Sequence, residues 1–300
     1  MTDARDGLLA IDKPAGPTSH DVVAWVRAAT GVVRVGHTGT LDPDATGLLL
    51  LVLGRATRLA RFVPDAPKTY HGTFALCVTT TTDDLSGDVV RTFDGPPPDP
   101  EAVRSAAAGL VGRQMQVPPA FSARRVSGTR LYRAARRGER LDAPPAEVFV
   151  MRLDVSKTEA PDRFAYEMVV SSGTYVRAIV RDIGEALGCG AAVASIRRTA
   201  IGPFGVEAAI RLPAEKAARR EAVFTHLIPL DAMPLALPSL ALEADADAVR
   251  FASGAIVPAQ LPGSVDPVLA AVRDRLGRLL GVGEWIGTTI KPRVVVPERP

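Results

Sequence analysis

Cysteine and histidine are scarce in this sequence, and neither occurs in a metal-binding pattern. The 300 residues include two cysteines, Cys77 and Cys189, which stand far apart with no CxxC spacing. We therefore expect neither a disulfide framework nor a thiolate zinc site. The four histidines form no HxH or HExxH pattern, so the sequence predicts no metal site.

Long apolar runs are also absent, since none reaches the roughly 20 residues that span a bilayer. The N-terminus, MTDARDGLLAIDK, lacks the basic and then apolar order of a secretion signal. We expect a cytoplasmic protein without a membrane partner. The content of 47% hydrophobic and 23% charged residues is that of a soluble globular protein with ample core, in one large or two modest domains.

Lysine is rare among the basic residues. Lysine and arginine together number 36 and only five are lysine, which leaves 31 arginines and a net charge of +3. Eight arginines lie between positions 113 and 140, against a single acid, Glu139. A stripe of one sign is typical of a polyanion partner, whereas solvated helix faces mix both signs. We expect nucleic acid to bind a basic arm at about residues 113–146, through Arg124, Arg125, Arg130, Arg133, Arg136 and Arg137.

The stretch from Val35 to Leu53, VGHTGTLDPDATGLLLLVL, joins a polar loop to an apolar run. The run Leu48–Leu53 predicts a buried strand, and the loop places His37 and Asp42 at its edge. Functional residues concentrate in loops that a rigid scaffold positions. Two interpretations remain open on these residues alone: an active-site loop around Asp42, or an ordinary turn, since Asp-Pro-Asp is common turn chemistry.

Helices and strands alternate along the rest of the chain. Ser19 is the expected N-cap of a helix that ends at Gly31, and alternation predicts a half-buried strand over residues 68–78. Asp99 can cap another helix, and a proline-punctuated linker is expected near Met233. The other expected elements are a short helix at 55–63, strands at 7–12, 89–93, 147–155 and 163–171, a helix at 174–187, a helical piece at 245–253, and strands at 267–272, 277–283 and 292–296.

A single aspartate with no metal cluster and no phosphate loop limits the chemistry. A carboxylate can act as a nucleophile or as a general base. If the substrate is RNA, a base that reacts must leave its stack and be held by aromatic or apolar side chains. Tyr70 and Tyr175 are candidates for that role, and plain core packing is the alternative.

The segment Asp42-Pro-Asp44-Ala-Thr46 also fits DxDxT, the phosphate-transfer signature of haloacid-dehalogenase-like enzymes. That chemistry needs an apolar strand before the motif, a later lysine and an acidic pair that binds magnesium. Here the apolar run follows the motif and lysines are few, although Asp83 and Asp84 could form the acidic pair. The order of the segments argues against this interpretation.

Seven spaced segments cover about residues 7 to 205: IDKPAGPTSHDVV, VGHTGTLDPDATGLLLLVLGRATR, KTYHGTF, TTTTDDLSGDVV, QVPPAFSARRVSGTRLYRAARRG, SSGTYVRAIVRDIGEALGCGA and SIRRTAIGPF. They occur in the order found in one enzyme family. The sequence resembles the tRNA pseudouridine synthase B (TruB) family, and seven spaced blocks make the likeness specific. The tail, RLGRLLGVGEWIGTTIKPRVVVP, more weakly resembles a PUA RNA-binding module.

The resemblance implies an α/β (α+β type) pseudouridine synthase fold. It has a mixed, mainly antiparallel central sheet flanked by helices in residues 1–232, and a small β-rich PUA-like domain in residues 233–300. It also implies isomerisation of the uridine at position 55, in the T-arm of tRNA, to pseudouridine. Neither a cofactor, a metal nor an obligate protein partner is implied.

The resemblance assigns roles to residues of this chain. Asp42 is the essential carboxylate, which can add to the sugar, add to the base or take a proton from the sugar. Tyr70 stacks on the uridine, and Arg177 pairs with Asp42 and keeps it ionised. His37, Asp84, Tyr175 and Ile196 are implied to surround the flipped-out nucleotide. Lys13 and Pro14 match a block that supports the active-site loop.

Three positions differ from the family's usual residues. Cys77 stands where glycine is usual, Phe121 where tyrosine is usual, and Arg125 where lysine is usual. We expect the first to affect packing alone and the other two to alter RNA contacts of the arm. A function from another class also fits the basic arm and tail, namely an RNA-binding or RNA-folding protein without catalysis.

Overall fold

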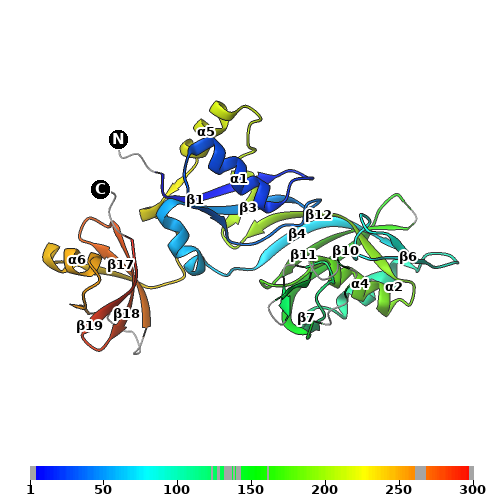
Figure 1. The fold of residues 1–300 in the computed structure, drawn as a ribbon. Coiled ribbons are helices and arrows are strands. Elements are labelled where there is room, and N and C mark those ends of the chain that lie inside the picture. The colour runs from blue at the N-terminus through cyan, green and yellow to red at the C-terminus, as the bar shows by residue number, and fades with distance from the viewer. Residues whose placement is uncertain are drawn as a thin grey trace. The chain divides into compact units, whose positions relative to one another are not determined.

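Figure 1 draws the fold of this computed structural model, which describes residues 5–122, 124–126, 129–131, 137, 139, 143–160, 162–260 and 268–296. The chain divides into two compact units. The first comprises residues 1–43, 48–65 and 208–300, and the second comprises residues 44–47 and 66–207. Within the described ranges, no helix has the length and apolar character needed to cross a membrane.

Strand β3 (Thr46–Leu53) carries the expected buried run, because every residue from Gly47 onward is buried. In the first unit β1 (Gly7–Lys13) lies next to it, and β2 (Val35–His37) pairs with it antiparallel. The short strand β14 (Ile228–Pro229) pairs with β1. A 3-10 helix, η1 (Gly54–Phe62), follows β3 where a short helix was expected. The polar loop between β2 and β3 is thus attached to a core strand.

Helices α1 (Ser19–Thr30) and α5 (Lys216–Thr225) pack against each other in the first unit. The N-cap of α1 is Thr18 rather than Ser19, because Thr18 and Asp21 form a reciprocal capping box. The expected cap was therefore wrong by one residue, and the Ser19 hydroxyl instead bonds to Leu41. Gly31 ends the helix as expected, with a φ of 72° that costs glycine little.

The C-terminal part of the first unit is a second sheet with its own core. The core gathers Leu240, Phe251, Val257, Val272 and Ile290, all buried. Both the helical piece and the three strands expected there are confirmed. The elements are η3 (Leu230–Ala232), β15 (Ser239–Leu242), α6 (Asp245–Ala252), β16 (Val257–Pro258), β17 (Val268–Asp274), β18 (Leu279–Ile286) and β19 (Thr289–Val295), and the sheet order is β15-β17-β18-β19-β16.

The second unit is built on an antiparallel sheet of order β12-β4-β11-β10-β7. Thr46 and Gly47, at the start of β3, pair parallel with β12, so the expected mixed and mainly antiparallel sheet is confirmed. The long strands are β4 (Lys68–Leu76), β7 (Gly112–Gln116), β10 (Ala146–Lys157), β11 (Arg163–Val170) and β12 (Ala191–Ile201). The short elements are β5 (Val78–Thr80), β6 (Val89–Thr92), β8 (Arg125–Val126), β9 (Thr129–Arg130), β13 (Phe204–Gly205) and η2 (Val206–Ala208).

Two helices cover one part of this sheet, α2 (Pro100–Ala108) against β10 and α4 (Val176–Ala186) against β12 (Figure 1). Asp99 caps α2 as expected, with Pro100 in the first turn. Helix α4 buries Val176, Ile179, Val180 and Ile183 on the sheet. Because these four side chains pack on the sheet, the orientation of the other side chains of α4 is also set.

Cys77 interrupts the strand that alternation predicted over residues 68–78. Its φ is 63°, in the left-handed region, so β4 ends at Leu76 and β5 starts at Val78. The expectation that cysteine in place of the family's glycine affects only packing was wrong. The backbone here takes a conformation that a side chain disfavours by roughly 1–2 kcal/mol.

Candidate active site

The residues on either side of Asp42 are anchored by hydrogen bonds within the first unit. Leu41 is buried; its backbone N–H donates to the Ser19 hydroxyl at 2.9 Å, and its carbonyl accepts from that hydroxyl at 3.0 Å. The carbonyl of Pro43 accepts from the backbone of Gly16 at 3.0 Å. Asp42 itself is partly exposed between these two anchors. Hydrogen bonds thus hold the backbone on both sides of Asp42.

Lys13 adds the strongest of these anchors. The side chain is 0% exposed, and its ammonium donates to the carbonyls of Pro14, Pro17 and Pro43, each at 2.8 Å. An ammonium has three donors, so these three bonds use a full set. The expectation that the block around Lys13 supports the loop is confirmed by the bond to Pro43.

His37 ends β2 on the same loop. It pairs with Leu51 of β3 and is partly exposed. His37 and Asp42 are therefore carried by one loop between two strands of the first unit. The other pocket residues of the sequence analysis all belong to the second unit.

Tyr70 lies on β4, 7% exposed, opposite Met168 of β11 and Arg198 of β12. Ile196 lies on β12 opposite Gly72, so Tyr70 and Ile196 share one face of the sheet. They are diagonal neighbours on adjacent strands. The resemblance had assigned both residues to the same nucleotide, and the structure places them as neighbours on the sheet.

A second tyrosine, Tyr166, was missed by the sequence analysis and lies beside Tyr70. It stands opposite Gly72 on β11, and its hydroxyl donates to the Ser195 carbonyl at 3.0 Å across the space that a glycine side chain leaves open. Burial, followed by the nearby Tyr70, raises the pKa of the Tyr166 phenol well above its usual value. Tyr166 thus stays neutral and supports the face on which Tyr70 sits. The alternation of residues 163–171 was its only signal in the sequence.

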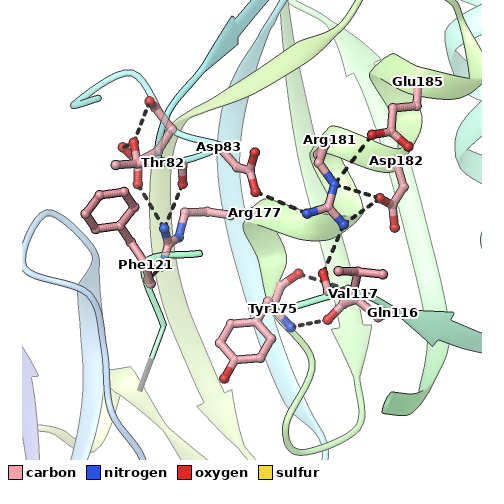
Figure 2. A network of polar contacts seen from close by, with 11 residues as sticks. Thr82, Asp83, Gln116, Val117, Phe121, Tyr175, Arg177, Arg181, Asp182 and Glu185 are labelled. Carbon is pink, nitrogen blue, oxygen red and sulfur yellow. Dashed lines mark hydrogen bonds and ion pairs between the residues drawn. The ribbon is translucent and has the colours of Figure 1, made fainter. Parts of the chain in front are cut away.

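Arg177, on α4, is 4% exposed and bonds to two segments distant in the sequence (Figure 2). One terminal nitrogen, Nη1, donates to the Thr82 carbonyl at 2.7 Å and lies 3.6 Å from an Asp84 carboxylate oxygen. The other, Nη2, donates to the Phe121 carbonyl at 2.9 Å. The structure therefore brings Arg177 and Asp84 together, as two of the residues that the resemblance placed around one pocket.

Asp84 is held in a tight turn and against β12. Its carboxylate accepts from the Thr82 hydroxyl at 2.7 Å and from the Ser86 backbone at 3.0 Å. The next residue, Leu85, donates its backbone N–H to Val193 of β12 at 2.8 Å. Asp84 therefore has a defined position relative to both α4 and the sheet.

Tyr175 precedes α4 and is fixed through its backbone. Its N–H donates to the Gln116 side-chain oxygen at 2.8 Å, and its carbonyl accepts from the same amide group at 3.2 Å (Figure 2). Gln116 is buried and ends β7, at the start of the basic arm. Gln116 was also missed, because a lone glutamine at the end of a strand carries no pattern.

The basic arm is described only in part. Arg125 and Arg130 lie on a two-strand hairpin of β8 and β9, while Arg133 and Arg136 lie outside the described residues. Arg124 is partly exposed and accepts a backbone bond from Leu131 at 2.9 Å. Arg137 is exposed and bonds to Glu139 at 2.8 Å, which lowers the pKa of that carboxyl. RNA binding by the arm stays a prediction.

In the part of the chain that the structure describes, no three His, Cys, Asp or Glu side chains are grouped so as to hold a metal ion. Asp83 and Asp84, the acidic pair that the phosphatase interpretation requires, each form an ion pair with an arginine. Asp83 lies 3.2 Å from Arg181, and Asp84 lies 3.6 Å from Arg177. The first unit thus carries a carboxylate on a held loop, and the second unit carries the buried guanidinium of Arg177 and the aromatic ring of Tyr70.

Comparison with known proteins identifies the family. Residues 27–176 match the TruB family pseudouridylate synthase N-terminal domain, and residues 177–233 match the tRNA pseudouridylate synthase B C-terminal domain. The "tRNA pseudouridine synthase B" of Cereibacter sphaeroides (strain ATCC 17025) is 44% identical over 243 residues, which are 81% of this chain and 80% of the relative. The protein of the same name from Burkholderia pseudomallei (strain 668) is 40% identical over 300 residues, 99% of this chain and 97% of the relative.

Solved structures share the fold at lower identity. The chain matches one described as the archaeal box H/ACA sRNP Nop10-Cbf5 complex with a TM-score of 0.71 at 24% identity, covering 98% of this chain and 87% of that one. An H/ACA RNP bound to a substrate RNA containing 2'-deoxyuridine gives a TM-score of 0.69 at 23% identity, covering 99% and 86%. These matches show the fold alone. The family is shown by the matched domains and the relatives: the chain belongs to the TruB family of pseudouridylate synthases.

Proposed function

We propose that this chain isomerises the uridine at position 55, in the T-arm of tRNA, to pseudouridine. The observation that carries the proposal is identity along nearly the whole chain to a relative named tRNA pseudouridine synthase B. The reaction breaks the bond from the base nitrogen to the ribose, turns the base and joins carbon 5 to the ribose. Carbon 5 loses its hydrogen as a proton, the base nitrogen freed from the ribose gains a proton, and no electrons enter or leave. The reaction therefore requires no redox cofactor.

Asp42 is the proposed essential carboxylate. Its neighbours Leu41 and Pro43 are held by Ser19 and Lys13, which supports a role that needs a fixed position. A carboxylate placed in this way is already positioned for attack or for proton abstraction, and positioning of this kind can supply a large part of a barrier reduction. Within the proposal the flipped-out uridine lies against Asp42.

Arg177 and Tyr70 are the proposed partners of Asp42 in catalysis. A guanidinium next to a carboxylate favours its ionised form, the form that acts as nucleophile or base at neutral pH. Tyr70, which neighbours Tyr166 on the sheet, provides an aromatic ring on which a uracil is proposed to stack. His37, Asp84, Tyr175 and Ile196 are proposed to surround the same nucleotide.

The remaining contacts are proposed from charge and from resemblance. The basic arm, about residues 113–146, would neutralise phosphates of the T-arm, through Arg124, Arg125, Arg130, Arg133, Arg136 and Arg137. The C-terminal sheet, within residues 233–300, would act as a PUA-like module on the acceptor end. Because tRNA is the substrate, the cytoplasm is the proposed location, and the chain is proposed to act without an obligate protein partner.

The test is release of tritium from tRNA labelled at carbon 5 of uridine, with the purified chain alone. The wild-type chain should release it from the T-arm, and not from a transcript with cytidine at position 55. Asp42→Asn should abolish release while RNA binding survives, because the amide keeps the shape and removes the charge. The matched control is Asp44→Asn, two residues along the same loop and exposed, which should stay near the wild-type rate. Full activity in Asp42→Asn would refute the assignment of the carboxylate.

The same assay separates the two rival functions. An RNA-binding protein without catalysis would bind the T-arm and release no tritium. A magnesium-dependent phosphatase would lose its activity to a chelator, whereas the isomerase should be indifferent. A stem-loop that lacks the acceptor end would bind as tightly as full tRNA if the C-terminal sheet makes no contact there.

A further inference from the structure

Arg181 is a second arginine on α4, one turn after Arg177, and the functional assignments above do not use it. Its side chain is 20% exposed. The guanidinium donates through Nε and Nη2 to Asp182 at 3.1 and 2.9 Å, and through Nη1 to Asp83 at 3.2 Å. Nη2 also donates to the Val117 carbonyl at 3.0 Å, and Nε lies 3.8 Å from Glu185 (Figure 2).

Arg181 contacts the same two segments that Arg177 contacts. One segment is the turn of residues 81–88, which Arg177 holds at Thr82 and Arg181 holds at Asp83. The other is the start of the basic arm, which Arg177 holds at Phe121 and Arg181 holds at Val117 (Figure 2). Residues four apart on a helix lie on one face. The two arginines therefore bind the turn and the arm to α4 at two successive levels.

Electrostatics favour a charged Arg181 at this place. Burial raises the pKa of both Asp83 and Asp182, and the guanidinium opposes that effect. For Arg181, burial lowers the pKa, but Asp182 and Asp83 outweigh it and the pKa is raised. Without the arginine, two largely buried carboxylates would lose the cation that offsets their desolvation, which is costly.

The backbone conformation of Asp83 also indicates that surrounding contacts constrain the turn of residues 81–88. Asp83 has a φ of 60°, in the left-handed region. Its carbonyl accepts from Val193 of β12 at 3.0 Å, while its carboxylate faces Arg181. An unfavourable backbone conformation persists only where surrounding contacts fix it. These contacts of Asp83 therefore also restrict the position of Asp84, the next residue in the chain.

We propose that Arg181 is a positioning residue of the isomerisation, acting through Asp83 on Asp84 in the pocket and through Val117 on the start of the RNA-binding arm. The inference deepens the proposed function and rests on it. One side chain would thus join the pocket and the arm, so that its loss alters both the chemical step and RNA binding. Arg177 cannot replace it, because that guanidinium is already bonded to Thr82 and Phe121.

The experiment is a double-mutant comparison of Arg181→Gln and Asp83→Asn, with single-turnover rates and T-arm binding measured separately. Each single variant should lower the rate constant about tenfold, since small misplacements cost large factors. The double variant should be no slower than the slower single one, because both changes break one contact. Only variants that lack Arg181 should also bind the T-arm more weakly, by about threefold, because the Val117 bond belongs to Arg181 and is of ordinary strength.

Arg104→Gln is the matched control, because Arg104 forms an exposed pair with Glu101 on α2 and should leave both quantities unchanged. If Arg181→Gln is too unstable to purify, Arg181→Lys keeps the charge with fewer donors and should show the same two effects, smaller in size. Rates and affinities of Arg181→Gln within twofold of wild type would overturn the proposal, whatever the melting temperature. A double variant slowed by the product of the two single factors would overturn it as well.

Hydrogen exchange keeps the positioning role separate from the proposed function. Arg181→Gln should speed exchange in peptides that cover residues 81–88, where Leu85 and Gly87 donate backbone bonds, and should not do so in α1. Unchanged exchange in 81–88 would refute the positioning role. If the wild-type chain released no tritium, the proposed function would fail, and this measurement would still decide whether Arg181 holds the turn.

Discussion

Replacing Lys13 by methionine tests whether a buried cation fixes the position of the loop that carries Asp42. Methionine has a similar length and keeps the packing, but it cannot donate to the carbonyls of Pro14, Pro17 and Pro43. The Pro43 carbonyl keeps a second donor, the Gly16 backbone. The substitution therefore removes three bonds, one from each carbonyl.

The magnitude follows from two opposing effects. A hydrogen bond to a charged group contributes about 1.5–3 kcal/mol, so three bonds of 2.8 Å would favour the native state strongly. Burying an ammonium that is 0% exposed costs several kcal/mol in the same balance. Pro14 is exposed, so its carbonyl can find water. We expect Lys13→Met to lower the free energy of unfolding by about 2–4 kcal/mol.

The effect on catalysis should be larger than the effect on binding. The Pro43 carbonyl adjoins Asp42, so loss of its ammonium partner lets the carboxylate shift. A shift of about 1 Å can cost about a hundredfold in rate. We expect the single-turnover rate of pseudouridine formation to fall by that factor at 25 °C, with a much smaller change in T-arm affinity.

Urea unfolding and single-turnover tritium release measure the two quantities on one preparation. Lys216→Met is the matched control, because Lys216 is exposed at the start of α5 and should change neither. A Lys13→Met chain with wild-type stability and a wild-type rate would refute the reasoning. Lower stability with an unchanged rate would restrict Lys13 to the fold and remove it from the positioning of Asp42.

Two further predictions concern stability. Cys77→Gly should raise the free energy of unfolding by about 0.5–1 kcal/mol, because relief of the left-handed conformation exceeds the entropy that glycine adds to the unfolded chain; urea unfolding checks it, and lower stability would show that the thiol contributes more than the strain costs. Asp274→Asn should destabilise the chain at neutral pH. Burial alone would raise the pKa of Asp274, but the bonds from Arg278 and Leu276 hold that pKa below the ordinary 3.8. The charged carboxylate therefore stabilises the fold above pH 3.8, and this stabilisation is lost as the pH falls further. The difference in unfolding free energy between wild type and variant should shrink in acid, and a difference independent of pH would contradict this.

Local pattern predicted much of the fold. The run Leu48–Leu53 could only be buried, because six successive apolar residues leave no polar face for a surface strand. Asp99 followed by Pro100 marked the start of α2 correctly, because both residues satisfy the needs of a first helical turn. Ser19 was misplaced as a cap because Thr18 has equivalent chemistry one residue earlier.

Long-range contacts explain what pattern could not predict. Arg177 reaches Phe121 and Thr82, 56 and 95 positions away in the chain, and no periodicity encodes such pairs. The strand break at Cys77 could not be predicted for another reason. The alternation of apolar and polar residues continues through this position, and only the backbone φ shows a conformation that favours glycine.

The same arrangement occurs in both units: a buried cation binds backbone carbonyls of loops that carry residues of the candidate site. Lys13 binds three carbonyls around Asp42, and Arg177 binds those of Thr82 and Phe121. A carbonyl acceptor is the same in every residue, so this anchoring does not restrict the side chains of the loops. Those side chains are therefore free to vary with the proposed RNA contacts, whereas replacement of either cation is expected to release the loop backbone. Phenylalanine at position 121, where the family usually has tyrosine, therefore leaves the bond from Arg177 to the backbone carbonyl unchanged.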